Sequence, residues 1–375
     1  MQYSADRLVC PAKRENNSKR PYLFVNPLQG KHIPADPAET LQMCRTLAEK
    51  VSTAWPEEKL YVIGFAETAT GIAAGIGLFL ENALYYQNTT RERGGTECLV
   101  FSESHSHAPE QLLRLPGMEE AVRATDRLIF IDDEVTTGNT ICKLIRLIRE
   151  RFGKEKKCGI VSILNSMTDE RLRGIGTEGT ECVYLARIPH EYGKDAILDV
   201  PFEPERHTTA CGTGEGRFRI SFDSPIDPRN TVRLADYLEA NKTFAETVIR
   251  DLAEGPRAEK MLIAGTEEFM FPTIMTGRMI LDRGLARSVR IHSRTRSPII
   301  ASGREGYPLF HRDRIRSPYD PERATYIYNL QQYDRAVVLT DAPEGAPGLG
   351  DLEAALQKAG NDAPLIAGWK LGEQR

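Results

Sequence analysis

The residues best suited to chemistry lie in the run 128–140, Leu-Ile-Phe-Ile-Asp-Asp-Glu-Val-Thr-Thr-Gly-Asn-Thr. A continuous apolar run, typical of a strand covered on both faces, ends in the paired carboxylates of Asp132 and Asp133. A loop then opens a helix, whose first N–H groups and dipole favour a phosphate. The carboxylates can accept hydrogen bonds from two neighbouring sugar hydroxyls, so the run predicts a sugar-phosphate site. The phosphate would bind to the loop residues Val135, Thr136, Thr137, Gly138, Asn139 and Thr140. The alternative is an acidic turn before a threonine-capped helix, because Asp and Thr are ordinary cap residues.

The elements around this run alternate between strands and helices. The patterns predict strands at 22–25, 60–64, 98–101, 128–131, 159–164 and 182–185, and helices at 38–51, 72–80 and 141–152. This alternation predicts an α/β fold with a doubly wound, mostly parallel sheet in the N-terminal half. In such sheets ligands bind at the carboxyl ends of the strands, which is where the two aspartates fall.

A second series of strands and helices predicts another α/β domain in the C-terminal half. Strands are expected at 217–222, 260–264, 288–292 and 336–339, the last of them being the final strand, and helices at 231–253, 270–283 and 349–359. A polar, arginine-rich loop is expected from the end of the strand at 288–292 to about residue 323. The predicted division is an N-terminal arm at 1–20, a first domain at 21–205, a proline- and glycine-rich junction at 206–229 and a second domain at 230–375.

Residues 128–140 resemble the PRPP-binding signature of the type I phosphoribosyltransferases, a family that includes the orotate enzymes. The resemblance implies that Asp132 and Asp133 hold the ribose 2- and 3-hydroxyls of PRPP, and that residues 135–140 bind its 5-phosphate. It also implies Mg²⁺ as a cofactor that is bound with PRPP and held only indirectly by the two aspartates. Glu134 departs from the family pattern, in which an aliphatic residue is usual.

A loop at residues 66–71 resembles the pyrophosphate loop of the same family. Its members are Ala66, Glu67, Thr68, Ala69, Thr70 and Gly71. Small side chains let backbone amides approach a pyrophosphate closely. Glu67 is the exception, because an acid repels pyrophosphate unless Mg²⁺ intervenes. An ordinary small-residue helix start is the alternative interpretation.

Residues 88–112 fall where the family carries its flexible catalytic lid. The candidate catalytic residues of this segment are Arg91, Glu103, His105 and His107. A cationic lid could cover the leaving pyrophosphate and exclude water. The His-x-His spacing is also compatible with a metal pair or with a plain surface loop.

Nearly the whole chain is similar to a subfamily found in bacterial tellurite-resistance and stress gene clusters. Residues 30–34 and 66–71 carry this likeness, and Thr295-Arg296-Ser297-Pro298 matches the tetrapeptide that names the subfamily's C-terminal TRSP domain. The resemblance implies a role in making a nucleoside-like or ribosylated metabolite.

A further set of residues is the candidate for an acceptor or anion site. It offers hydroxyls, a guanidinium and a strand-to-helix loop, which together suit an anion. The set is Lys31, His32, Gly265, Thr266, Glu267, Thr295, Arg296 and Ser297. The alternatives are a structural lysine, a turn histidine and a solvated basic loop.

Composition limits the classes of protein and partner. The 375 residues include 49 basic and 53 acidic ones, a net charge of −4, which argues against nucleic-acid binding. The seven scattered cysteines include no C-x-x-C pair, so neither a disulfide framework nor a cysteine zinc site is expected. The longest apolar stretch, 71–80, is too short to span a bilayer, and residues 1–20 do not form a secretory signal. We therefore expect a cytoplasmic protein with small-molecule substrates and no membrane partner, and leave a homodimer and pathway-protein partners open.

The predicted function is the PRPP-dependent transfer of ribose 5-phosphate to an unidentified acceptor, nucleobase-like or another small molecule, with release of pyrophosphate. One alternative is a non-catalytic PRPP or nucleotide sensor. Another is a C-terminal module that binds proteins of the same pathway. A third is hydrolysis or phosphorolysis of a nucleoside monophosphate in the same pocket.

Overall fold

The computed structural model describes residues 3–15, 21–102, 110–153, 155–189, 192–193, 195, 197–212 and 214–372. The chain forms two compact units, which we call unit 1 and unit 2. Unit 1 contains residues 1–5, 41–190 and 226–240, and unit 2 contains residues 6–40, 191–225 and 241–375. These units group residues that lie close together in space and are not continuous in sequence. The domain boundaries predicted from the sequence at 20, 205 and 229 therefore stay a prediction.

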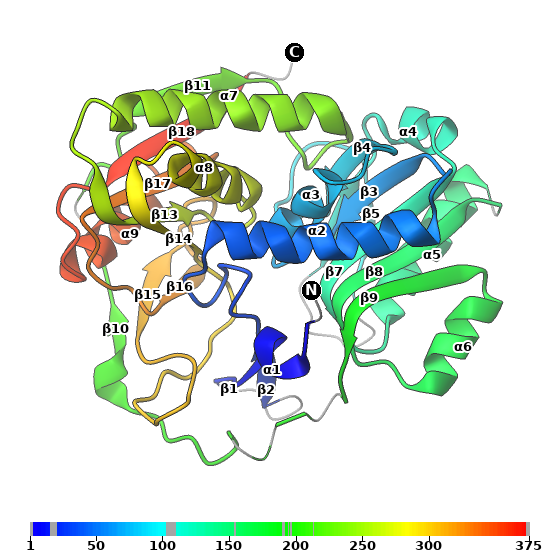
Figure 1. Cartoon of the computed structure of the whole chain (residues 1–375), viewed down its shortest axis with the longest axis horizontal. Helices are drawn as coiled ribbons and strands as arrows, with labels where there is room; N and C mark the ends of the chain where they lie inside the picture. Colours follow the sequence, from blue (N-terminus) through cyan, green and yellow to red (C-terminus); the bar gives the residue numbers. More distant parts are fainter. Residues whose placement is uncertain are drawn as a thin grey trace. The chain divides into compact units, whose positions relative to one another are not determined.

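Unit 1 is built on a six-stranded sheet with the order β12-β4-β3-β7-β8-β9 (Figure 1). Its strands are β3 (Leu60–Gly64), β4 (Ala83–Asn88), β7 (Arg127–Val135), β8 (Lys157–Asn165), β9 (Thr180–Arg187) and β12 (Val232–Arg233). All the pairings are parallel except that of β12 with β4. This arrangement confirms the predicted mostly parallel α/β sheet.

Helices cover the sheet of unit 1 and bury apolar side chains against it. They are α3 (Thr70–Gly77), α4 (Met118–Ala124), α5 (Asn139–Phe152) and α6 (Asp169–Thr177), together with most of α2 (Pro37–Ala54). In α5, Ile141, Leu144, Ile145 and Ile148 are buried and join the core around Phe130 and Ile160. A two-stranded hairpin, β5 (Cys98–Phe101) with β6 (Gln111–Arg114), lies outside this sheet.

Unit 2 has a five-stranded, wholly parallel sheet with the order β11-β18-β17-β13-β14. Its strands are β11 (Ile220–Ser224), β13 (Ala258–Gly265), β14 (Ala286–Ser293), β17 (Arg335–Thr340) and β18 (Leu365–Leu371), with helices α8 (Phe271–Asp282) and α9 (Pro347–Lys358). A smaller sheet has the order β10 (His207–Thr209), β15 (Arg312–Arg316) and β16 (Ala324–Tyr328), next to the 3-10 helix η2 (Pro204–Arg206). The remaining elements are α1 (Ala5–Leu8), the antiparallel pair β1 (Cys10–Lys13) and β2 (Tyr22–Val25), and α7 (Leu234–Leu252), which crosses from unit 1 to unit 2.

Several sequence expectations are wrong at the level of elements. The predicted N-terminal arm contains a helix and a strand, because residues 10–13 pair with residues 22–25. The predicted arginine-rich loop contains β15, whose side chains are largely buried despite three arginines. The final strand is β18 rather than the predicted one at 336–339, and the strand expected at 217–222 begins three residues later, at Ile220.

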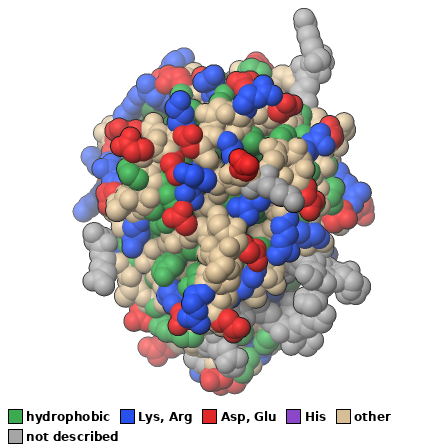
Figure 2. All heavy atoms as spheres, turned by 90° about the vertical axis from the view of Figure 1, so that its right-hand side faces the viewer, with side chains coloured by type: hydrophobic (Ala, Val, Ile, Leu, Met, Phe, Trp, Pro, Cys, Tyr) green, Lys and Arg blue, Asp and Glu red, His purple; other side chains and the backbone are tan. Residues whose placement is uncertain are grey.

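Two surface features bear on the expected partners. None of the helices formed by the described residues combines the length and apolarity needed to cross a bilayer. On the face drawn in Figure 2, basic and acidic side chains are interspersed.

Candidate functional site

The acid pair lies at the carboxyl end of β7, and its two members are linked to each other. Asp132 and Asp133 are both half-buried, and the amide of Asp133 donates to Asp132 Oδ1 at 2.9 Å. The hydroxyl of Thr68 donates to Asp133 Oδ1 at 2.8 Å. Because β3 pairs with β7 in parallel, the loop after β3 and the end of β7 meet at one edge of the sheet. The structure thus brings the predicted 66–71 loop to the predicted sugar-binding aspartates.

Within the acid pair, Asp132 has a raised pKa. Burial, followed by the neighbouring carboxylates of Asp133 and Glu134, raises the pKa of Asp132 well above its usual range. Two carboxylates this close resist joint ionisation. A hydrogen-bond donor or a cation at this place would therefore be stabilised by relieving their repulsion.

The 135–140 loop joins β7 to α5 through a left-handed glycine. Gly138 has a φ of +69° and caps α5, and a Cβ there would lie 3.2 Å from Ile175 Cδ1 and from Met167 Sδ. Thr137 and Asn139 are exposed, and the Thr137 hydroxyl accepts from the Asn139 amide at 3.3 Å. Within the described chain, no acceptor is recorded for the amides of Thr136, Thr137 and Gly138. Such a loop at a helix N-terminus is suited to bind an anion through its backbone.

Arg171 is a residue near this loop that the sequence analysis missed. Its Nε donates to the Thr137 carbonyl at 2.9 Å, and its Nη2 donates to Asn139 Oδ1 at 3.1 Å. It also lines a hollow of about 410 Å³ with Lys143 and Arg146. Arg171 lies on α6, more than thirty residues from the loop, and no local pattern marks it.

The 66–71 loop runs from β3 to α3 among small, mostly buried residues. The Ala66 amide donates to Thr89 Oγ1 at 2.8 Å, and the Ala69 amide donates to the Phe65 carbonyl at 3.0 Å. The Ala66–Glu67 peptide is cis, and the Glu67 side chain is buried. Thr68 is the half-buried member of the loop, and it is the one that contacts the acid pair.

The predicted lid residues are only partly covered by the structure. Arg91 is half-buried and follows Thr90, which is buried and pairs with Leu112. Glu103, His105 and His107 lie outside the described residues. The hairpin of β5 and β6 overlaps the predicted lid segment, and the catalytic roles of the lid residues stay predictions.

In unit 2, part of the predicted acceptor or anion set gathers around Glu267. The Lys31 ammonium, which is wholly buried, donates to the Glu267 carbonyl at 2.6 Å. Arg296 Nε donates to Glu267 Oε2 at 2.8 Å, so the guanidinium expected to cradle an anion is already held by a buried carboxylate. Thr266 bonds through its hydroxyl to the hydroxyl of Thr340 at 2.9 Å.

The other members of that set lie in the backbone framework of unit 2. His32 packs against Tyr328 with a ring-centroid distance of 6.3 Å, and the Thr295 hydroxyl accepts from the Ser297 amide at 3.2 Å. A Cβ on Gly265 would lie 2.5 Å from the Phe269 carbonyl oxygen, so only glycine fits there. Their direct roles toward a ligand stay predictions.

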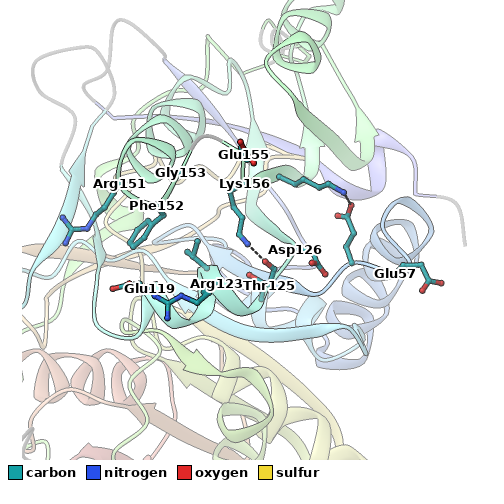
Figure 3. Close-up of a pocket in the computed structure, with 13 residues that line it drawn as sticks. Glu57, Glu119, Arg123, Thr125, Asp126, Arg151, Phe152, Gly153, Glu155 and Lys156 are labelled. Carbon is teal, nitrogen blue, oxygen red and sulfur yellow. Dashed lines mark hydrogen bonds and ion pairs between the residues drawn. The ribbon is translucent and has the colours of Figure 1, made fainter.

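A wide hollow of unit 1 lies away from these loops (Figure 3). It has a volume of about 1340 Å³ and is lined by Glu58, Asp126 and Lys157 among others. These residues precede or begin β3, β7 and β8, so the hollow lies at the amino ends of parallel strands, at the edge opposite the acid pair. Two pairs of its charges lie close together, Lys157 with Glu58 at 2.7 Å and Arg123 with Glu119 at 2.8 Å.

Among the described residues, no group of three or more His, Cys, Asp or Glu side chains gathers as a metal site would. The adjacent carboxylates of the acid pair nevertheless fit a hard cation, because Mg²⁺ prefers oxygen ligands. The mutual repulsion that raises the pKa of Asp132 is what such a cation would relieve.

Two family models match successive parts of the chain. Residues 8–182 match the family model of a phosphoribosyl transferase, and residues 229–356 match that of the TRSP domain that follows it. The chain therefore contains a phosphoribosyltransferase domain of that family, followed by a TRSP domain. This family assignment confirms the predicted enzyme class.

Solved structures of phosphoribosyltransferases are similar to about half of this chain. The adenine enzyme of Rhodothermus marinus is 16% identical and covers 49% of this chain and 96% of its own, with a TM-score of 0.33. The orotate enzyme of Aeropyrum pernix is 18% identical and covers 48% of this chain and 88% of its own, with a TM-score of 0.31. No curated protein matches the sequence.

Proposed function

We propose that this phosphoribosyltransferase uses PRPP and transfers its ribose 5-phosphate to a small acceptor, with release of pyrophosphate. The observation that carries the proposal is the hydrogen bond from Thr68 to Asp133, which joins the loop proposed for pyrophosphate to the carboxylates proposed for ribose. In that assignment, the loop at 135–140 binds the 5-phosphate. Binding groups for the pyrophosphate, the ribose and the 5-phosphate of PRPP would then lie together at one edge of the sheet.

The reaction breaks the bond from ribose C1 to the pyrophosphate oxygen and forms a bond from C1 to the acceptor. Its transition state has oxocarbenium character, as in other glycosyl transfers. The residues act by positioning and by charge rather than as nucleophiles. Asp132 and Asp133 fix the ribose through its two hydroxyls, and the amides at 136–138 hold the phosphate.

Mg²⁺ bound with PRPP would neutralise the leaving pyrophosphate. We propose that Asp132 and Asp133 hold it indirectly, through the ribose hydroxyls. The lid residues Arg91, Glu103, His105 and His107 are proposed to cover the pyrophosphate and exclude water. The acceptor is proposed to be nucleobase-like, or another small molecule, in a stress or tellurite-resistance pathway.

The decisive test replaces both carboxylates with amides. The double variant Asp132→Asn, Asp133→Asn should bind PRPP–Mg²⁺ at least tenfold more weakly in calorimetry, because the ribose loses two charged acceptors. Circular dichroism should show an unchanged fold. Unaltered PRPP affinity in the folded variant would refute the assignment.

A sensor that binds PRPP without transfer is the second candidate. Pyrophosphate release across a panel of nucleobases separates the two candidates. Release with at least one base supports the transferase, whereas tight PRPP binding without release for any acceptor favours the sensor.

A further inference from the structure

The smaller sheet of unit 2 contains an arginine cluster that the proposed function does not use. Arg314 and Arg316 are two residues apart on β15, so their side chains project from the same face of that strand. Arg323 ends the loop from β15 to β16 and lies beside Arg316, because Arg316 pairs with Ala324. The three arginines line a hollow of about 160 Å³, which we call the arginine pocket.

Two of these arginines are fixed in place by carboxylates that are wholly buried. Arg316 donates to Asp351 through Nε at 2.8 Å and through Nη2 at 2.8 Å. Arg323 donates through Nη2 to Glu267 Oε2 at 3.3 Å and to the Ser317 hydroxyl at 2.8 Å. Burial alone would raise the pKa of Asp351, but hydrogen bonds from Arg316 and from the Gly212 amide outweigh it, and the pKa is lowered. The pair with Arg316 is therefore ionised, and both guanidinium groups are preorganised.

The arginine pocket also has donors that are not committed to the protein. A guanidinium has five N–H donors, and the bonds of Arg316 to Asp351 leave its Nη1 without an acceptor in the part of the chain that the structure describes. Arg314 is exposed, and no hydrogen bond or ion pair of its guanidinium with another described residue is recorded. Two acids line the pocket, the exposed Glu322 and the buried Asp351 that pairs with Arg316.

The dimensions and lining of the pocket define what it can take. Its volume is several times the ~30 Å³ that a water molecule occupies in the liquid, and below the ~300–1,000 Å³ of pockets that enclose whole drug-sized ligands. Ala210 and Ile315, both buried, form apolar parts of the lining. Apolar surroundings lower the local dielectric and strengthen attraction between charges. Forked guanidinium groups match the oxygens of a phosphate.

We propose that the arginine pocket of unit 2 binds the phosphate group of a small phosphomonoester, separately from the PRPP site of unit 1. Arg316 provides the fixed donor through its Nη1, Arg314 binds the anion from β15, and Arg323, which is held by Glu267, Ser317 and Asp320, adds positive charge beside them. This gives unit 2 a ligand of its own. The proposal goes beyond the proposed function and does not depend on it.

Cys211 provides a local reporter of occupancy because its exposed thiol lines the same pocket. The experiment measures alkylation of Cys211 in the full chain by peptide mass spectrometry, with ribose 5-phosphate and inorganic phosphate as separate probes. Sodium chloride at matched ionic strength controls for screening. We expect either phosphate probe to slow alkylation of Cys211 at least fivefold, and chloride to leave it unchanged.

Matched variants locate the effect. Arg314→Gln should weaken the protection at least tenfold in probe concentration, whereas Arg287→Gln, an exposed arginine on β14 with a side chain 76% exposed, should preserve it. Protection by phosphate alone or only by ribose 5-phosphate supports the site and tells whether the sugar contributes. No protection by either probe, or equal protection in Arg314→Gln, would overturn the proposal.

A third variant separates this proposal from the proposed function. Asp132→Asn, Asp133→Asn alters unit 1 only, so it should retain full protection of Cys211. If that variant binds PRPP normally while Cys211 is still protected, the proposed function fails and the arginine pocket stands. If protection of Cys211 disappears in it, the pocket is not an independent site and the proposal fails.

Discussion

At the scale of single residues, the acid pair works as a unit with its hydrogen-bond donors. The Asp133 amide holds one oxygen of Asp132, and the Thr68 hydroxyl holds one oxygen of Asp133, so each carboxylate keeps an oxygen for a ligand. A carboxylate that is fixed before the ligand arrives loses less entropy on binding. Thr68 is therefore a positioning residue for the proposed ribose site.

The hydroxyl of Thr68 can be tested by itself. Thr68→Val should weaken PRPP binding about tenfold, corresponding to about 1.4 kcal/mol, near the lower end for a hydrogen bond to a charged group. Thr68→Ser retains the hydroxyl and should bind PRPP as the wild type does. Equal affinities of the Val and Ser variants in calorimetry would contradict the positioning role.

A second prediction concerns the buried histidine of unit 2. Burial lowers the pKa of His292 from 6.5 to about 4, and its Nε2 lies 2.7 Å from the Tyr328 carbonyl oxygen. The unfolded chain therefore binds a proton at His292 between those pH values when the folded chain does not. Stability should fall as the pH drops from 6.5 to about 4, by about 3 kcal/mol in total.

Tryptophan fluorescence can follow that loss in unit 2. Trp369 is buried there and Trp55 is the other tryptophan of the chain, so a Trp55→Phe background leaves one reporter. Below pH 6.5, the free energy of unfolding measured in urea should fall more steeply with pH for the Trp55→Phe protein than for the Trp55→Phe, His292→Gln protein. The glutamine amide can still donate to the Tyr328 carbonyl. Parallel pH profiles in the two proteins would be the contrary result.

At the scale of elements, the loops that follow β3 and β7 could be predicted, because their chemistry is local in sequence. The apolar run, the aspartates and the glycine of β7 and its loop occupy consecutive positions. Arg171 could not be predicted, since only the packing of α6 brings it to the loop.

The strand β15 was not predicted because Arg312, Asp313 and Arg316 are residue types that usually lie on the surface. In unit 2, ion pairs and an aromatic contact let these side chains be buried or half-buried. Burial of charge by distant partners leaves no periodic signal.

The junction of β3 with α3 gives a prediction at this scale. A Cβ on Gly64 would lie 2.6 Å from Ala73 Cβ and 3.0 Å from Asn88 Oδ1, so Gly64→Ala must push α3 away from the strand. We expect a loss of about 1–3 kcal/mol in the free energy of unfolding, as for other overpacked cores, and weaker PRPP binding because the 66–71 loop shifts.

The control for this change is Gly174→Ala in the same unit. Gly174 lies within α6, and a Cβ there would have no neighbour within 4 Å. That variant should be neutral or more stable by about 0.5–1 kcal/mol, since alanine favours the helix. Urea denaturation of both variants provides the comparison, and equal stabilities of the two would exclude a steric role for Gly64.

At the scale of the whole molecule, the chain enters unit 2 three times. Unit 2 contains the segments 6–40, 191–225 and 241–375. It is therefore not formed by one continuous C-terminal stretch of the chain. The segment 6–40 supplies the buried Lys31, and Ala35 bonds through its amide and carbonyl to Ile291 on β14. The segment 191–225 supplies β11, an edge strand of the five-stranded sheet. A TRSP domain defined by its sequence match at 229–356 lacks all of these parts.

This interleaving predicts how fragments behave. A fragment of residues 230–375 lacks β11, which pairs with β18 from Ile220 with Ala367 to Ser224 with Leu371. It also lacks the Phe222 ring, whose centroid lies 5.0 Å from that of Trp369, a type of contact that contributes about 0.5–1.5 kcal/mol. In this fragment the edge of β18 is exposed and Trp369 is uncovered. We therefore expect a lower urea midpoint of unfolding, and tryptophan emission at a longer wavelength, than for unit 2 in the Trp55→Phe chain.

A fragment of residues 191–375 regains β11. Its urea midpoint should be intermediate, because it still lacks Lys31 and Ala35. Unfolding of fragment 230–375 at the same urea midpoint as the full chain would mean that the sequence-defined domain is self-sufficient and that the interleaved segments add no stability.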